Sequence, residues 1–132
     1  MAIGDPRDEY LDASSNQRQY MTLRFAQLTV YLALTGFLFK FAFVEEAGVA
    51  PFVRTVLKGA GLVTTLLFWI HQERTMLFWT HFVKRAAELE ADLGFRQYSG
   101  RPRSGVLSSF KAMRLFYILI VLFWATSFFW SR

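Results

Sequence analysis

The stretch Leu115–Trp130, LFYILIVLFWATSFFW, decides the fold, because it holds sixteen consecutive residues without a charge. Two further charge-free runs precede it, Phe25–Phe39 and Gly59–Ile70. A transmembrane helix needs about 20 predominantly apolar residues. Each run reaches that length only with its flanking Lys and Arg residues, whose aliphatic stems extend to the lipid headgroups. The three runs predict an all-α, integral membrane helical bundle with about three transmembrane helices.

The intervening segments complete a single predicted membrane domain. Residues 1–19 are expected to form a cytoplasmic tail with one helical turn around Asp8–Ala13, and Ser14, Ser15 or Asn16 is expected to cap the first span. Pro51 is expected in the first turn of the second span, and Ser104 or the pair Ser108–Ser109 at the start of the third. The predicted order is transmembrane helices over 20–44, 52–70 and 111–130, with a cytoplasmic helix over 71–94 and a basic loop over 95–108.

Composition supports the membrane interpretation. Hydrophobic residues make up 54% of the chain and aromatic residues 18%, and the charges concentrate outside the apolar runs. The net charge of +5 would suggest nucleic-acid binding in a soluble protein, but here it fits cytoplasmic segments that lie against anionic lipid. Most of the 15 Lys and Arg residues fall in 1–24 and 74–114. The bias predicts an inner (cytoplasmic) membrane protein with its N-terminus in the cytoplasm and its C-terminus outside.

The second span is predicted to continue out of the membrane, because no helix breaker lies between Gly61 and Leu93. Beyond the membrane the helix is amphipathic, and Gly94 fits its C-cap. The apolar face must lie against the headgroup layer, the chain's own bundle or neighbouring subunits, and we favour the last. The candidate oligomer interface is Trp79, Phe82, Ala86, Leu89 and Leu93.

A polar stripe on the first span is the most suggestive feature for function. Its members recur at helical spacing and so share one face: Arg24, Gln27, Tyr31 and Thr35. Such groups are costly against lipid and face protein or water. They could line a pore or form interhelical hydrogen bonds, and we favour the bonds because an ion pathway would need an acid or His at depth. On the second span, Gly59, Gly61, Thr64 and Thr65 form a small-residue patch that suits close helix packing.

No residue pattern predicts catalysis. The two histidines, His71 and His81, are ten residues apart, about 15 Å along a helix, and cannot share a metal. Cysteine is absent, so thiolate sites and disulfides are excluded. Glu88, Glu90 and Asp92 are expected on a solvated charged face. We therefore predict no catalytic, cofactor-binding or metal-binding residues and no enzyme activity.

The segment Glu73–Tyr98, ERTMLFWTHFVKRAAELEADLGFRQY, resembles the small oligomeric bacterial membrane proteins described as RipA-like. A span that runs into a cytoplasmic helix is also similar to SLATT domains, two-span modules proposed to form pores. This chain departs from the two-span plan because the run Leu115–Trp130 follows. The resemblance implies oligomerisation and pore formation, and it assigns no functional residue.

Together these features predict a non-enzymatic multipass membrane protein. We expect a homo-oligomer that forms a pore or a membrane scaffold. The alternative is a small accessory subunit of a larger transport, respiratory or secretion complex. The expected partners are the lipid bilayer and further copies of the chain or other membrane subunits; no nucleic acid and no cofactor are expected.

Overall fold

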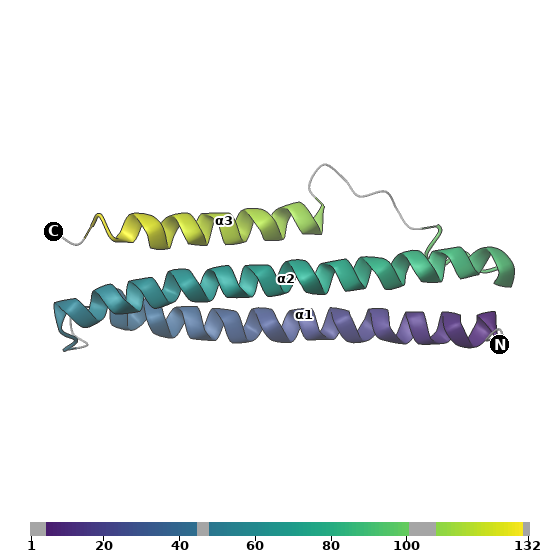
Figure 1. Cartoon of the computed structure of the whole chain (residues 1–132), viewed down its shortest axis with the longest axis horizontal. Helices are drawn as coiled ribbons and strands as arrows, with labels where there is room; N and C mark the ends of the chain where they lie inside the picture. Colours follow the sequence, from purple (N-terminus) through teal and green to yellow (C-terminus); the bar gives the residue numbers. More distant parts are fainter. Residues whose placement is uncertain (1–4, 45–47, 101–107, 131–132) are drawn as a thin grey trace. The chain divides into compact units, whose positions relative to one another are not determined.

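The computed structural model describes residues 5–44, 48–100 and 108–130, which form three α-helices (Figure 1). Helix α1 spans Pro6–Phe43, α2 spans Pro51–Leu93 and α3 spans Ser109–Ser127. No β-strand occurs among these residues. Each helix is long and apolar enough to cross a membrane. The prediction of an all-α chain with three candidate spans is confirmed.

Local signals in the sequence mark the helix ends. Before α1, Asp5 Oδ1 accepts a hydrogen bond from Arg7 N at 2.9 Å. Helix α2 begins at Pro51, where the missing N–H of proline would have had no helical partner. Ser108 caps α3 with its side chain, and Gly94 follows α2 at φ 73°, a left-handed conformation that suits glycine. These observations confirm two predicted helix starts, at Pro51 and in the pair Ser108–Ser109. They also confirm the predicted C-cap at Gly94.

Helix α1 begins far earlier than predicted, at Pro6 rather than near Tyr20. Ser14, one of the expected caps, lies inside the helix. The physical reason is tertiary packing, because Tyr10 and Ala13 are buried in a cluster with residues of α2. Burial of one face stabilises a helix whose polar sequence predicts only a short turn.

Helix α2 is continuous over 43 residues. At 1.5 Å per residue it is about 65 Å long, roughly twice the 30 Å thickness of a bilayer's hydrocarbon core. Any bilayer that α2 crosses must therefore leave a long part of the helix outside. The prediction that one continuous helix extends beyond the second apolar run is confirmed.

The chain forms two compact units, each of which contains part of α1 and part of α2. The charged unit comprises Met1–Ala26 and Gln72–Ser104, and the apolar unit comprises Gln27–His71 and Gly105–Arg132. Within each unit α1 and α2 lie side by side and run in opposite directions (Figure 1). Helix α3 belongs to the apolar unit alone.

The core of the charged unit is aromatic and aliphatic. Its buried members come from α1 and α2, and partly buried apolar residues pack around them: Tyr10, Ala13, Ala86 and Leu89, then Phe82, Leu93 and Tyr98. Tyr20 of α1 stacks on Phe78 and Phe82, with ring centroids 5.8 and 5.6 Å apart. The apolar face of 71–93 is therefore covered by α1.

The core of the apolar unit forms where all three helices meet, with Leu38 and Ala42 of α1 clustered with Trp124 of α3. Trp124 is fully buried, and its ring lies so close to Gly61 that an added Cβ would be 2.5 Å from ring carbons. Only glycine permits that approach, as the small-residue patch predicted. Gly59, in the same patch, has no such neighbour within 4 Å.

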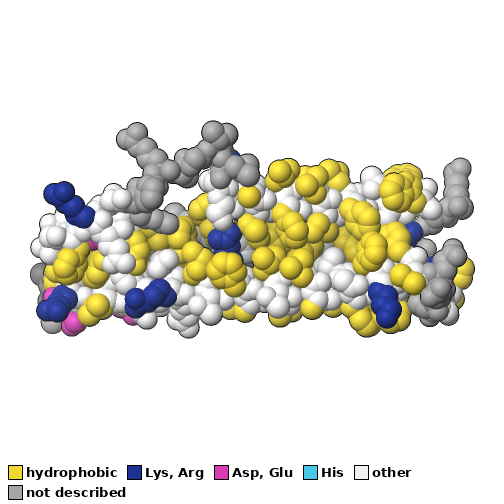
Figure 2. Space-filling model, turned by 180° about the vertical axis from the view of Figure 1, so that it is seen from behind, with side chains coloured by type: hydrophobic (Ala, Val, Ile, Leu, Met, Phe, Trp, Pro, Cys, Tyr) yellow, Lys and Arg dark blue, Asp and Glu magenta, His cyan; other side chains and the backbone are white. Residues whose placement is uncertain are grey.

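The outer faces of the apolar unit are strongly hydrophobic. The most apolar 18-residue windows of α1, α2 and α3 are only 17%, 17% and 11% buried. Large side chains such as those of Phe52, Leu67 and Leu119 are more than half exposed. Figure 2 shows one face on which such hydrophobic side chains gather. Soluble proteins rarely expose contiguous apolar surface of this extent, so the finding supports a membrane protein.

Candidate functional site

The polar stripe of α1 makes interhelical hydrogen bonds in the apolar unit. Gln27 Nε2 lies 2.6 Å from His71 Nε2, and Tyr31 Oη lies 3.1 Å from Thr65 Oγ1. Thr65 donates its only hydroxyl proton to the Gly61 carbonyl at 2.8 Å. Tyr31 must therefore be the donor to Thr65. Both contacts join α1 to α2, as the interhelical interpretation of the stripe predicts.

Tyr31 is the centre of this packing. It is fully buried, and its ring lies 5.3 Å from the rings of both Phe68 and Tyr117, while Phe116 approaches edge-on at 6.3 Å. The ring thus contacts α2 and α3 while its hydroxyl group bonds to α2. A buried tyrosine with its hydroxyl satisfied combines apolar area with directional specificity.

The other two members of the stripe, Arg24 and Thr35, are half-buried. Arg24 belongs to the charged unit and Thr35 to the apolar unit. The structure joins Gln27 and Tyr31 of the stripe to α2 by hydrogen bonds. Their polar groups bond to protein, so they stabilise helix packing.

Lys58, one of the basic residues that flank the run Gly59–Ile70, is a buried cation. Its ammonium group donates to the Ser127 carbonyl at 2.9 Å and lies 5.1 Å from the centre of the Phe43 ring. That carbonyl is one of the last in α3, where the helix dipole concentrates partial negative charge. Lys58 thus ties α2 to the end of α3.

The five candidate interface residues all lie in the charged unit. Ala86 and Leu89 are buried in its core, Phe82 and Leu93 pack against that core, and Trp79 is buried as well. Of the three options left open for this face, the structure shows contact with the chain's own bundle.

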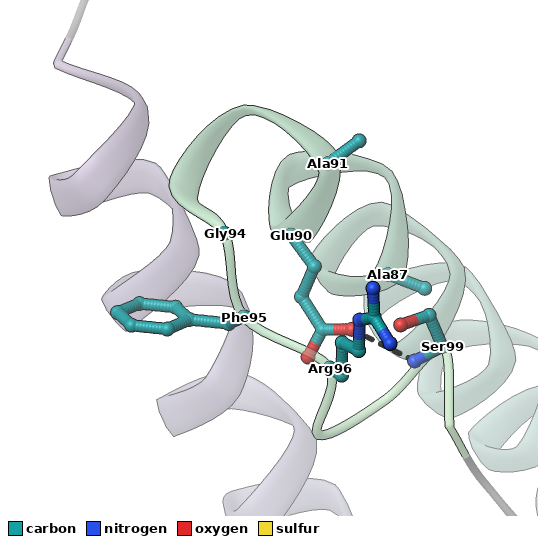
Figure 3. A pocket seen from close by; sticks show the side chains of 7 residues that line it. All are labelled: Ala87, Glu90, Ala91, Gly94, Phe95, Arg96 and Ser99. Atoms are coloured by element: carbon teal, nitrogen blue, oxygen red, sulfur yellow. Dashed lines mark hydrogen bonds between the residues drawn. The ribbon is translucent and has the colours of Figure 1, made fainter.

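Glu90 is the principal site residue that the sequence analysis missed, since it was expected on a solvated face. It is almost completely buried, and its carboxylate accepts hydrogen bonds from Tyr98 N at 2.7 Å and Ser99 N at 2.8 Å. Tyr10 donates a longer bond at 3.4 Å. Figure 3 shows the carboxylate turned toward the loop after α2, beside an open pocket of about 310 Å³. Glu88 and Asp92 are exposed as expected.

The environment of Glu90 favours its ionised form. Burial alone would raise the pKa of this carboxyl, but the donated hydrogen bonds from Ser99 and Tyr98 outweigh burial and lower the pKa. Burial and the nearby Glu90 charge raise the pKa of Tyr10. A carboxylate near a helix C-terminus opposes the helix dipole, and here the two backbone donors offset that cost. Glu90 therefore fixes the loop to α2.

An ion pair completes the charged unit. Arg85 donates two hydrogen bonds to the Glu9 carboxylate, at 2.6 and 3.0 Å, and a third to Glu88 at 3.3 Å. Hydrogen bonding to Arg85 lowers the pKa of Glu9. The contact with Glu88 lies within α2, and the contact with Glu9 joins α1 to α2. Pairs this exposed are screened by solvent and stabilise weakly.

Comparison with known protein families, curated proteins and solved structures found no match to this chain. The resemblance to RipA-like and SLATT proteins therefore stays a prediction, and a functional assignment has to rest on the geometry of the chain itself.

Proposed function

We propose that this chain is a non-enzymatic membrane scaffold that crosses the bilayer three times and assembles with further copies of itself. The observation that carries the proposal is the low burial of the apolar windows, 17%, 17% and 11% in the three helices. A surface this apolar is stable only when lipid or other apolar helices cover it. The proposed orientation places the N-terminus in the cytoplasm of a cell with an inner membrane, on the basis of the Lys and Arg distribution.

A scaffold fits the polar residues better than a pore within one subunit. Gln27 and Tyr31 bond to His71 and Thr65, so these side chains do not present their polar groups to a channel. A pore, if the assembly forms one, would lie between copies. The polar contacts instead give each subunit a defined helix arrangement.

The outer face of α3 is the proposed contact between copies. Helix α3 packs on α1 and α2 through Tyr117 and Trp124, while Leu115, Leu119 and Leu122 remain at least half exposed. These leucines recur at spacings of four and three and so form one stripe. Helices in lipid associate through such van der Waals packing of complementary surfaces.

The test begins with extraction of the membranes at alkaline pH, which should leave the full chain in the pellet. Native mass spectrometry in mild detergent should then show a discrete homo-oligomer. A monomer would overturn self-assembly, and constant co-purification with different chains would favour an accessory subunit.

The contact surface can be mapped because the chain has no cysteine. Leu119→Cys should crosslink between copies under mild oxidation in membranes. Leu67→Cys, on the exposed side of α2, is the matched control and should crosslink far less. Equal crosslinking at both positions would exclude α3 as the specific contact.

A further inference from the structure

Helix α3 carries two cations at its N-terminal end, beside an exposed apolar surface. Lys111 and Arg114 are both exposed, and Arg114 directly precedes the charge-free run that starts at Leu115. Ile118, four residues after Arg114, is 40% exposed. Spacings of three and four place Lys111, Arg114 and Ile118 on one stripe of the helix. All three residues belong to the apolar unit.

Helix geometry gives the depth of these residues, on the proposed function that α3 enters the bilayer from the cytoplasmic side. Lys111 precedes Leu115 by four residues, about 6 Å of helix, and the headgroup layer is about 5–8 Å thick. Side chains on a helix lean toward its N-terminus, which for α3 is the headgroup side. The ammonium group of Lys111 therefore reaches phosphate depth. Ile118 lies about 10 Å further along the helix, within the hydrocarbon.

The charge of this stripe favours an anionic lipid over a second copy of the chain. The sequence Gly105–Arg132 contains no Asp or Glu, and the only acids of the apolar unit are Glu45 and Glu46. These two follow the end of α1, which is the non-cytoplasmic end in the proposed topology. An apolar unit packed in parallel against the stripe thus offers no carboxylate to Lys111 or Arg114, and it brings its own cations to the same depth.

We infer that Lys111, Arg114 and Ile118 bind one anionic phospholipid of the cytoplasmic leaflet. The two cations attract its phosphate, and Ile118 contacts the upper part of an acyl chain. The order of these groups along α3 is the order of a phospholipid, with charge at the headgroup and apolar surface deeper in the bilayer. The inference rests on the proposed function, because α3 must cross the bilayer from the cytoplasmic side.

The first test counts bound lipid on the full chain in mild detergent by native mass spectrometry. Dioleoyl phosphatidylglycerol is compared with dioleoyl phosphatidylcholine, which has the same acyl chains and no net charge. We expect the first adduct to favour phosphatidylglycerol. Lys111→Gln should weaken that adduct about fivefold, the loss expected for one basic residue near an anionic lipid surface.

Lys84→Gln is the matched control, because Lys84 is also an exposed helical lysine. It lies fourteen residues after Ile70, about 21 Å of helix, and therefore beyond the headgroup layer. This variant should leave the preference for phosphatidylglycerol unchanged. Equal binding of the two lipids by the wild type, or equal losses in Lys111→Gln and Lys84→Gln, would overturn the site.

The second test asks whether lipid or a second copy covers Ile118. Ile118→Cys should crosslink between copies far less than Leu119→Cys, because consecutive side chains are rotated by about 100° around the helix. Efficient crosslinking of Ile118→Cys would show a second copy at this stripe and would overturn the lipid site. Release of the chain from membranes at alkaline pH would instead overturn the proposed function, so the two failures are distinguishable.

Discussion

The charged and apolar units pack the same two helices with different chemistry. In the charged unit, the Glu90 carboxylate is buried, and backbone N–H groups and a phenol surround it. In the apolar unit, the buried Tyr31 bonds through its neutral hydroxyl group to Thr65 among aromatic rings. The buried ammonium group of Lys58 in the same unit lies at the C-terminal end of α3, where it donates to the Ser127 carbonyl. Exposed ion pairs such as Glu9–Arg85 occur beside the first site.

The difference matches the solvents that the proposed function assigns to the two units. Ionised groups are stable where water or several strong donors are near, and isolated charges are costly in hydrocarbon. Neutral hydroxyl bonds and close approach of small residues are the contacts that suit helices in lipid. The comparison therefore predicts that substitutions in the two units respond differently to pH and salt.

Removal of the Glu90 carboxylate should have the largest effect. Glu90→Ala leaves the Tyr98 and Ser99 N–H groups without their acceptor. With charge-assisted hydrogen bonds at about 1.5–3 kcal/mol each, we expect the unfolding free energy to fall by about 3 kcal/mol. Hydrogen exchange of residues 94–100 should accelerate strongly. Glu88→Ala, at an exposed acid on the same helix, is the control, and equal exchange in both variants would contradict the role of Glu90.

The same carboxylate predicts a dependence of stability on pH. The folded state lowers the pKa of Glu90, so its contribution is complete above the pKa of the unfolded chain, about 4.3. The contribution is lost as the pH falls through the lower folded pKa. Thermal unfolding of the wild type and of Glu90→Gln should therefore converge on acidification, because glutamine does not titrate. A constant gap between the two proteins from neutral to acidic pH would refute this assignment.

In the apolar unit, the largest expected effect is at Gly61. Gly61→Ala adds a Cβ that would lie 2.5 Å from the Trp124 ring, and such overpacking costs about 1–3 kcal/mol. The melting temperature in detergent should fall. Gly59→Ala is the matched control, because its Cβ would meet nothing within 4 Å and alanine favours a helix over glycine by up to about 1 kcal/mol. Parallel losses in the two variants would show that close packing at Gly61 is not the cause.

The apolar runs and helix signals were enough to predict most of the fold. Charge-free runs located the three candidate spans, and Pro51, Ser108 and Gly94 marked helix ends by backbone chemistry that depends on neighbouring residues alone. The start of α1 could not be predicted in this way. Its first turns are polar, and only the contacts of Tyr10 and Ala13 with a segment far along the chain stabilise them.

For the site residues too, local spacing was predictable from the sequence, whereas contacts with distant segments were not. The spacing of Gln27 and Tyr31 predicted a shared face, but their partners His71 and Thr65 depend on the register between two helices. Glu90 did leave a signal, because it lies four residues after the buried Ala86 and so shares its side of α2. What the sequence could not show is that the loop after Gly94 returns to the helix and supplies two N–H donors.

Loss of the Tyr31 hydroxyl should have a smaller effect than Glu90→Ala or Gly61→Ala. Tyr31→Phe keeps the ring packing but removes the bond to Thr65, which we expect to lower stability by about 1 kcal/mol. Thr65→Val should cost more, because it also leaves the Tyr31 hydroxyl without its acceptor. The double variant should then cost less than the two single variants added together, which thermal unfolding of all four proteins can test. Simple additivity would mean that the two residues do not interact.

The exposed ion pair should have the smallest effect, and salt distinguishes it from the buried bond of the apolar unit. Glu9 and Arg85 side chains are 47% and 42% exposed, so mobile ions screen their attraction. Glu9→Gln should lower the melting temperature slightly at low salt and have no measurable effect at high salt. Tyr31→Phe should lower it by the same amount at both salt concentrations, because no charge is involved. Equal salt responses in the two variants would mean that the same kind of interaction stabilises both units.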